Sequence, residues 1–206
     1  VNASVTKLPT CTTGATITAI GGGGTSPYEY ELRQSNGITV VTAFINNGGV
    51  FTNVATGNYT VFVRDANKCV NAIGVPVSVT AAVAPVASLD ATTDWCYTTA
   101  NPATLVVNAS GGLSPYTYAL DGNTPVNTKS FSNIAPGTHT IVVTDSNSCT
   151  TKISNITIAD QLQLNATLAQ DLTCLDNASI TATVVGGYGA PYTYSVSRNG
   201  GTPTSV

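Results

Sequence analysis

A repeat within this 206-residue chain constrains its fold more than any other feature. Residues 51–69 read FTNVATGNYTVFVRDANKC, and residues 131–149 read FSNIAPGTHTIVVTDSNSC. The two segments lie eighty positions apart and share nine of nineteen residues. Self-similarity at a fixed period indicates a tandem array in which each repeat is one folded unit.

A second motif occurs three times and precedes the first motif in both complete units. It consists of glycines followed by Pro-Tyr-x-Tyr, at residues 22–30, 111–118 and 186–194. A cysteine opens each unit: Cys11, Cys96 and Cys174. The third unit keeps only the first half of this order. We therefore predict three domains: repeat 1 at residues 1–81, repeat 2 at 82–161, and the truncated first half of repeat 3 at 162–206.

Alternating side chains predict β-strands around both motifs. Tyr28, Tyr30 and Leu32 alternate with charged residues, and the counterparts at 116–120 and 192–196 repeat the apolar face. Only 8% of the residues are charged, against roughly 25% in an average soluble domain, and Met is absent. Strong helix formers are therefore scarce. The pattern predicts an all-β fold of tandem immunoglobulin-like antiparallel β-sandwich repeats, each of about 80 residues.

Composition and charge exclude several classes of function. A formal net charge of −3 argues against nucleic-acid binding, which needs a basic surface. No apolar run reaches the roughly 18 residues of a membrane span, so we expect no membrane insertion within this segment. Residue 1 is Val and no signal peptide follows it. We therefore expect a processed chain or a part of a longer one, with the export signal outside it.

We do not expect an enzyme active site. The single histidine, His139, lies six residues from Asp145 on one predicted strand, which separates the two by ~20 Å. A nucleophile and its base need hydrogen-bond contact. No catalytic residue is predicted, and we expect His139 to pack on its strand at the position where Tyr59 is a corner tyrosine.

Two loop motifs could suggest ligand sites, but each has a simpler structural interpretation. Residues 21–24 are glycines without the following Gly-Lys-Ser/Thr of a phosphate loop, so they predict a turn. Asp-x-Asn at 65–67 and 145–147 could supply calcium ligands, but a complete site takes roughly six to eight oxygens. We favour Asx-type turns there, and we predict no metal site and no cofactor.

Two aromatic residues flank Cys96. On an extended segment Trp95 and Tyr97 would point the same way, and such a pair can stack on a sugar ring or pack against a neighbouring domain. The segment lies close to a predicted domain end. This position favours an inter-repeat contact over a glycan contact.

The repeated motifs resemble a known family. Gly-Gly-x-x-Pro-Tyr-x-Tyr followed by Gly-x-Tyr-Thr-Val-x-Val-x-Asp-x-Asn-x-Cys is similar to the SprB-type repeat of very large cell-surface adhesins in gliding and related Bacteroidota. It is also similar, more loosely, to polycystic-kidney-disease-type repeats. The half motifs cover most of the two complete units and the start of the third, and His139 stands where the family has Tyr. The resemblance implies a secreted protein of the bacterial cell surface, exported by type IX secretion and used in adhesion or gliding motility.

These observations predict a structural and adhesive function. We expect a stalk or filament segment whose partners are the neighbouring repeats of the same chain. Surface polysaccharide, other cells and self-association into filaments are further expected partners. The alternative is a carbohydrate-binding β-sandwich module attached to a secreted enzyme.

Five cysteines suggest disulfides, which persist outside the cytosol. Pairing within each repeat would join Cys11 to Cys69 and Cys96 to Cys149. Sandwich topology argues otherwise, because Cys11 lies at the first turn and Cys69 at the sixth, at opposite ends of strands ~20 Å long. Bridged Cα atoms lie within about 7 Å of each other. Topology therefore favours Cys11–Cys149, leaving Cys69 for a preceding repeat and Cys96 and Cys174 for later ones, but the sequence leaves both pairings open.

Overall fold

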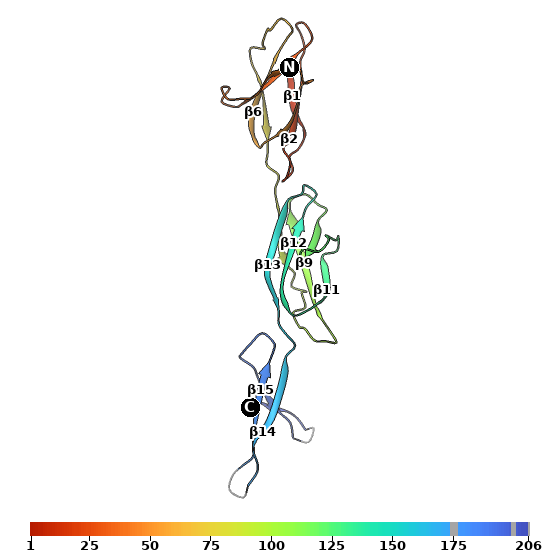
Figure 1. Cartoon of the computed structure of the whole chain (residues 1–206), viewed down its shortest axis with the longest axis vertical. Helices are drawn as coiled ribbons and strands as arrows, with labels where there is room; N and C mark the ends of the chain where they lie inside the picture. The colour runs from red at the N-terminus through yellow and green to blue at the C-terminus, as the bar shows by residue number, and fades with distance from the viewer. Residues whose placement is uncertain (174–176, 199–200, 206) are drawn as a thin grey trace. The chain divides into compact units, whose positions relative to one another are not determined.

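The computed structural model describes residues 1–173, 177–198 and 201–205, and the strands within them fall into three groups (Figure 1). The first group is β1 (Asn2–Lys7), β2 (Ala15–Ile20), β3 (Glu29–Gln34), β4 (Val40–Ile45), β5 (Val50–Val54), β6 (Gly57–Arg64) and β7 (Val75–Val79). The second is β8 (Pro85–Leu89), β9 (Ala103–Gly111), β10 (Thr117–Leu120), β11 (Ser130–Ile134), β12 (Gly137–Thr144) and β13 (Thr150–Ile158). The third is β14 (Gln163–Gln170), β15 (Ser179–Val185), β16 (Ser195–Val196) and β17 (Thr204–Ser205). In these described ranges no helix is long and apolar enough to cross a membrane.

The first group forms a sandwich of two antiparallel sheets. One sheet has the order β1-β2-β5 and the other the order β4-β3-β6-β7. Across β3 and β6, Tyr30 pairs with Val63 and Leu32 with Val61, so the alternating apolar residues of both strands enter one core. The buried core residues are Ala15, Ile17, Ala19, Tyr30, Leu32, Phe51, Val54, Tyr59, Val61, Val63, Val77 and Val79. The predicted all-β, immunoglobulin-like fold is confirmed.

The second group repeats this plan with one strand reduced. Its sheets have the orders β11-β9-β8 and β10-β12-β13. An isolated bridge between Tyr118 and Val126 stands where β4 pairs with β3 in the first group. Alternate residues of β9, β12 and β13 are buried: Ala103, Leu105, Val107, Ile141, Val143, Ile156 and Ile158.

The third group has a β14–β15 hairpin and a short β16–β17 pair. The tyrosine directly after proline, predicted to lie on the strand of each unit, precedes that strand at Tyr28, Tyr116 and Tyr192, so the prediction was wrong for these three. It was also wrong for Tyr194, which lies outside β16, although its counterparts Tyr30 and Tyr118 lie on β3 and β10. The corresponding strands β3 and β10 pair with β6 and β12, which carry the Gly-x-Tyr motif or its His variant. Among the described residues of the third group no strand takes that place. An extended segment without a neighbouring strand has no ladder to join.

The charged residues of β3 are not all open to solvent. Glu31 is 4% exposed and forms an ion pair with Arg33. The guanidinium carbon of Arg33 lies 4.7 Å from the centroid of the Phe62 ring, and that of Arg64 lies 4.5 Å from the centroid of Phe44. These cation–π contacts cover part of the outer face of the sheet.

Tyr59, near the start of β6, is the predicted corner tyrosine. Its hydroxyl donates to the carbonyl oxygen of Ala55 at 2.9 Å. At the equivalent position of β12, Nε2 of His139 lies 2.9 Å from the carbonyl oxygen of Ala135. The His139 imidazole therefore contacts the carbonyl oxygen four residues earlier in the chain, as the Tyr59 hydroxyl does.

Backbone contacts divide the chain into two compact units. Unit 1 comprises Val1–Ser88, Ala109–Asn127 and Val142–Lys152, and unit 2 comprises Leu89–Asn108, Thr128–Ile141 and Ile153–Val206. Unit 1 contains the whole first sandwich together with the segments around Cys11 and Cys149. The domain boundaries at 81/82 and 161/162 stay predictions.

Candidate functional site

Two loops of the same construction present a cysteine, residues 65–69 (the Cys69 loop) and residues 145–149 (the Cys149 loop). In both, the aspartate amide donates to the cysteine carbonyl, at 3.1 and 2.9 Å, and the cysteine amide donates back to aspartate Oδ1 at 2.9 Å. The residue before the cysteine has a positive φ, 66° at Lys68 and 58° at Ser148. The amide of Asn147 also donates to Asp145 Oδ1 at 2.9 Å, which confirms an Asx-type turn.

The glycine-rich loop of each unit is closed by the tyrosine of its Pro-Tyr motif. The hydroxyl of that tyrosine donates back to a glycine carbonyl oxygen. The pairs are Tyr28 to Gly23 at 2.8 Å, Tyr116 to Gly111 at 2.5 Å, and Tyr192 to Gly186 at 3.1 Å. The glycines therefore form the predicted turn between strands.

Asp65 and Asp145 connect the two motifs of their units. Oδ2 of Asp65 accepts the amide of Thr25 at 3.1 Å, and Oδ2 of Asp145 accepts the amide of Leu113 at 2.9 Å. Both carboxylates are buried, with the residues 8% and 5% exposed. Since both oxygens of each already accept backbone hydrogen bonds, we interpret these aspartates as supports for the loops. Within the part of the chain that the structure describes, no group of three or more His, Cys, Asp or Glu residues could hold a metal ion.

The same hydrogen bonds lower the pKa of both carboxyl groups. At Asp65 the amides of Cys69 and Thr25 hold the pKa below its ordinary value, against the opposing effect of burial. At Asp145 burial opposes ionisation most strongly, but the amides of Leu113, Cys149 and Asn147 together outweigh it and lower the pKa. The native state therefore prefers both carboxylates in the ionised form.

We expect Asp145→Asn to reduce the acid sensitivity of the fold. A group whose pKa is lower in the native state stabilises it above the unfolded pKa of about 3.9, and this stabilisation is lost as the pH falls through the native pKa. The variant should be about 2 kcal/mol less stable at pH 7, because hydrogen bonds to a charged acceptor are lost. Plotted against pH, the free energies of unfolding of the two chains should run parallel above about pH 5 and approach each other below about pH 4. Curves that stay parallel down to pH 3 would contradict the prediction.

Residues 8–14, the first-turn segment, present Cys11 at the tip of a tight bend. Oγ1 of Thr10 accepts the amides of Thr12 and Thr13, at 3.2 and 2.9 Å. The amide of Thr10 donates to the carbonyl of Thr13 at 2.9 Å. The threonines thus hold the bend by themselves and leave the amide of Cys11 for an outside acceptor.

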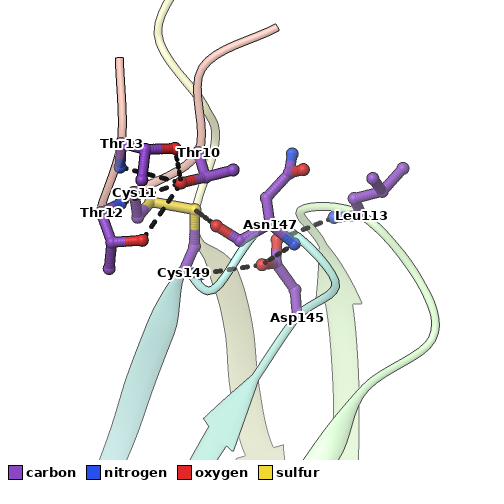
Figure 2. Close-up of a disulfide and its surroundings, with 8 residues drawn as sticks. All are labelled: Thr10, Cys11, Thr12, Thr13, Leu113, Asp145, Asn147 and Cys149. Atoms are coloured by element: carbon purple, nitrogen blue, oxygen red, sulfur yellow. Dashed lines mark hydrogen bonds between the residues drawn. A yellow bond between two sulfur atoms is a disulfide. The ribbon is translucent and has the colours of Figure 1, made fainter. Parts of the chain in front are cut away.

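That acceptor and the sulfur partner both belong to the Cys149 loop (Figure 2). Cys11 and Cys149 form a disulfide with an S–S distance of 1.99 Å and a Cα–Cα distance of 4.9 Å. The amide of Cys11 donates to the carbonyl oxygen of Asn147 at 3.0 Å. Cys149 is fully buried. The structure therefore has the between-repeat pairing, and not Cys11–Cys69.

The other cysteines differ in position and exposure. Cys69 and Cys96 are exposed and carry no disulfide, so the within-repeat bridge Cys96–Cys149 is also absent from the described residues. The predicted pairings of Cys69 with a preceding repeat and of Cys96 with a later one stay predictions. Cys174 lies outside the described residues.

Trp95 and Tyr97 lie beside residues of the third group within unit 2. Trp95 is 40% exposed, and its carbonyl oxygen accepts the hydroxyl of Tyr188 at 3.1 Å. Tyr97 is half-buried and lines an open groove of about 530 Å³ with Thr99, Gln161 and others. Their role, as a glycan contact or an inter-repeat contact, stays a prediction.

Sequence reasoning missed the residues that support the bridge. Asp145 was interpreted only as a turn residue, and the contact of its carboxylate with Leu113 was not foreseen. A signal was present, because an aspartate precedes the loop cysteine by four residues in both complete units, at Asp65 and Asp145. The glycines gave a second signal. Gly24 and Gly112 precede their Pro-Tyr pairs by the same number of residues, and they lie close to the carboxylates of Asp65 and Asp145 respectively.

Comparison with known proteins agrees with the repeat interpretation. Residues 166–201 match the family model of the SprB repeat. No curated protein matches the chain. A solved structure of fibronectin(III)-like modules of Clostridium thermocellum CbhA is similar with 18% identity over 68% of this chain and 82% of that chain, at a TM-score of 0.31. That likeness adds nothing to the fold described above. The chain carries a SprB-type repeat at residues 166–201, within a series of immunoglobulin-like β-sandwich repeats.

Proposed function

We propose that this chain is a stalk segment of a large adhesin on the bacterial cell surface, where it transmits tension during attachment or gliding. SprB repeats and a disulfide both fit an extracellular location. Only residues 80–84 and 159–162 separate the three strand groups. Connections this short leave little free chain between repeats, which suits a segment that holds a distal site away from the cell. Export by type IX secretion, adhesion and the absence of catalysis belong to the same proposal.

The observation that carries the proposal is the Cys11–Cys149 bridge. Its cysteines are 138 residues apart in the sequence. Tension applied at the two ends of the chain passes through residues 1–11, crosses the disulfide and continues from residue 149. Residues 12–148 form a closed loop outside this covalent path, so strands β2 to β7 of the first sandwich are shielded from the pulling force, whereas β1 lies in the path.

Single-molecule pulling of the oxidised chain should therefore release much less length than pulling of the reduced chain. Extended chain spans at most about 3.5 Å per residue, so the full 206 residues reach about 720 Å. With the bridge closed, only the 69 residues 1–11 and 149–206 remain extensible, and the length falls to about 240 Å. The double variant Cys69→Ser/Cys96→Ser should behave like the native chain. Equal lengths with and without reductant would overturn the proposed mechanical role.

The alternative, a carbohydrate-binding module, predicts a different result. Glycan arrays probed with the same chain would show saturable binding that is lost in Trp95→Ala. No binding, together with the shortened oxidised length, supports the stalk.

A further inference from the structure

We propose that the Cys69 loop is a docking site that receives the first-turn segment of another SprB-type repeat and closes a disulfide with it. The inference extends the proposed function to a specific partner. It rests on the observation that the same loop, one repeat later, already holds such a segment.

The two loops match in their internal contacts. Each aspartate accepts the cysteine amide on Oδ1 and a glycine-loop amide on Oδ2, at 2.9 and 3.1 Å for Asp65 and 2.9 and 2.9 Å for Asp145. In each loop the next amide donates to the glycine loop in return, from Ala66 to Thr25 and from Ser146 to Leu113, at 2.8 Å in both cases. The Cys69 loop is therefore preformed in the geometry that binds Cys11 elsewhere in the chain.

The two loops differ in what covers them. At the Cys149 loop, Cys11 contributes the sulfur and an amide to Asn147, and the cysteine is fully buried. Leu8 and Pro9 of the first-turn segment line a groove of about 190 Å³ there, beside Gly112 and Asn147. At the Cys69 loop the cysteine is exposed.

An open groove lies beside the exposed Cys69. Its volume is about 260 Å³, and its lining includes Gly23, Tyr28 and Val70. Val70 is 49% exposed. A Cβ placed on Gly23 would meet no atom within 4 Å, whereas one on the equivalent Gly111 would lie 3.7 Å from the carbonyl oxygen of Ala84. At the Cys149 loop this glycine is approached by Ala84, in the connection between β7 and β8, and at the Cys69 loop no described residue takes that place.

The chemistry of the partner follows from the bound example. It is an extended segment with a cysteine whose amide is free to donate, held by threonines as in Thr10-Cys11-Thr12-Thr13. Closure of the bridge is an exchange with a small-molecule disulfide such as glutathione disulfide. The two protein thiols form one S–S bond, the glutathione S–S bond breaks, and two glutathione thiols take up the two protons and the two electrons.

Cys96 gives an internal control within the same chain. It is also exposed and unbonded, but no such loop surrounds it. Its own amide donates to Oδ1 of Asp94 at 3.0 Å. The disulfide exchange of Cys96 with a peptide therefore serves as the reference for an exposed cysteine that has no docking loop.

The test is a thiol–disulfide exchange equilibrium between the folded chain and a synthetic peptide with the sequence of residues 6–14, TKLPTCTTG, in a glutathione buffer. Peptide mapping by mass spectrometry measures the mixed disulfide at each cysteine. We expect an exchange constant at Cys69 at least tenfold larger than at Cys96. The peptide of reversed sequence should not distinguish the two sites. A peptide with N-methylated cysteine, which cannot donate to the loop carbonyl, should lose most of the preference.

A further control comes from Cys11→Ser, which frees the Cys149 thiol but leaves the first-turn segment, with its backbone amide, tethered beside the Cys149 loop. In that variant Cys149 should capture less peptide than Cys69, because the tethered segment competes for the loop. Equal exchange constants at Cys69 and Cys96 for the native peptide would overturn the inference. This result would leave the pulling experiment unaffected, so the failure of the docking site and the failure of the stalk function can be told apart.

Discussion

Reduction of the Cys11–Cys149 bridge is expected to lower the free energy of unfolding by about 5 kcal/mol. The cysteines are 138 residues apart, and in the chain-entropy model a loop of this length restricts the unfolded chain by about that amount. Nearly all of the first two predicted repeats lies inside the closed loop. The unfolded ensemble of both repeats is therefore restricted by one covalent bond.

Urea unfolding followed by circular dichroism measures this effect. The native chain with reductant and the double variant Cys11→Ser/Cys149→Ser should show similar losses of stability. The double variant Cys69→Ser/Cys96→Ser alters only exposed, unbonded cysteines and should stay within about 0.5 kcal/mol of the native chain. A change below 1 kcal/mol on reduction would show that the bridge does not constrain the unfolded state in this way.

The fold followed from the sequence because its signals are local and repeated. Alternation around Tyr30 and Leu32 predicts a strand with one apolar face, and that face forms the core of the first sandwich. The same alternation failed at Tyr194, whose counterparts Tyr30 and Tyr118 lie on strands, and there the described chain offers no strand for pairing. Side-chain periodicity indicates which face a strand would bury, but the strand itself depends on a neighbour elsewhere in the sequence.

The candidate site was predictable in part. Placing Cys11 at the first turn and Cys69 at the sixth already separates these two cysteines, because chain topology alone puts the turns at opposite ends. The support of the Cys149 loop was not predictable in this way. Asp145 reaches Leu113 across 32 positions of sequence, and a hydrogen bond between a side chain and a distant amide leaves no periodic trace. The burial of Glu31 under Arg33 was missed for a similar reason, since both residues have the alternation of an exposed face.

The second large effect is expected at the centre of the first core. Ile17 of β2 is fully buried and pairs with Val5 of β1 and Phe51 of β5. Ile17→Ala removes three carbon atoms from a closely packed site between two sheets. The loss of burial and the resulting cavity together cost about 3 kcal/mol. Urea unfolding should show a lower midpoint with an unchanged slope, because the area exposed on unfolding hardly changes.

Ile38→Ala is the matched control, because it removes the same atoms from the same sandwich. Ile38 lies between β3 and β4 and is 82% exposed, so its truncation should change stability by less than about 0.5 kcal/mol. The contrast between the two isoleucines tests whether Ile17 is a core residue. It does so independently of the disulfide, because neither isoleucine is hydrogen-bonded to, or paired on a strand with, Cys11 or Cys149. If both variants lost the same stability, Ile17 would not lie in the core between the two sheets of the first sandwich.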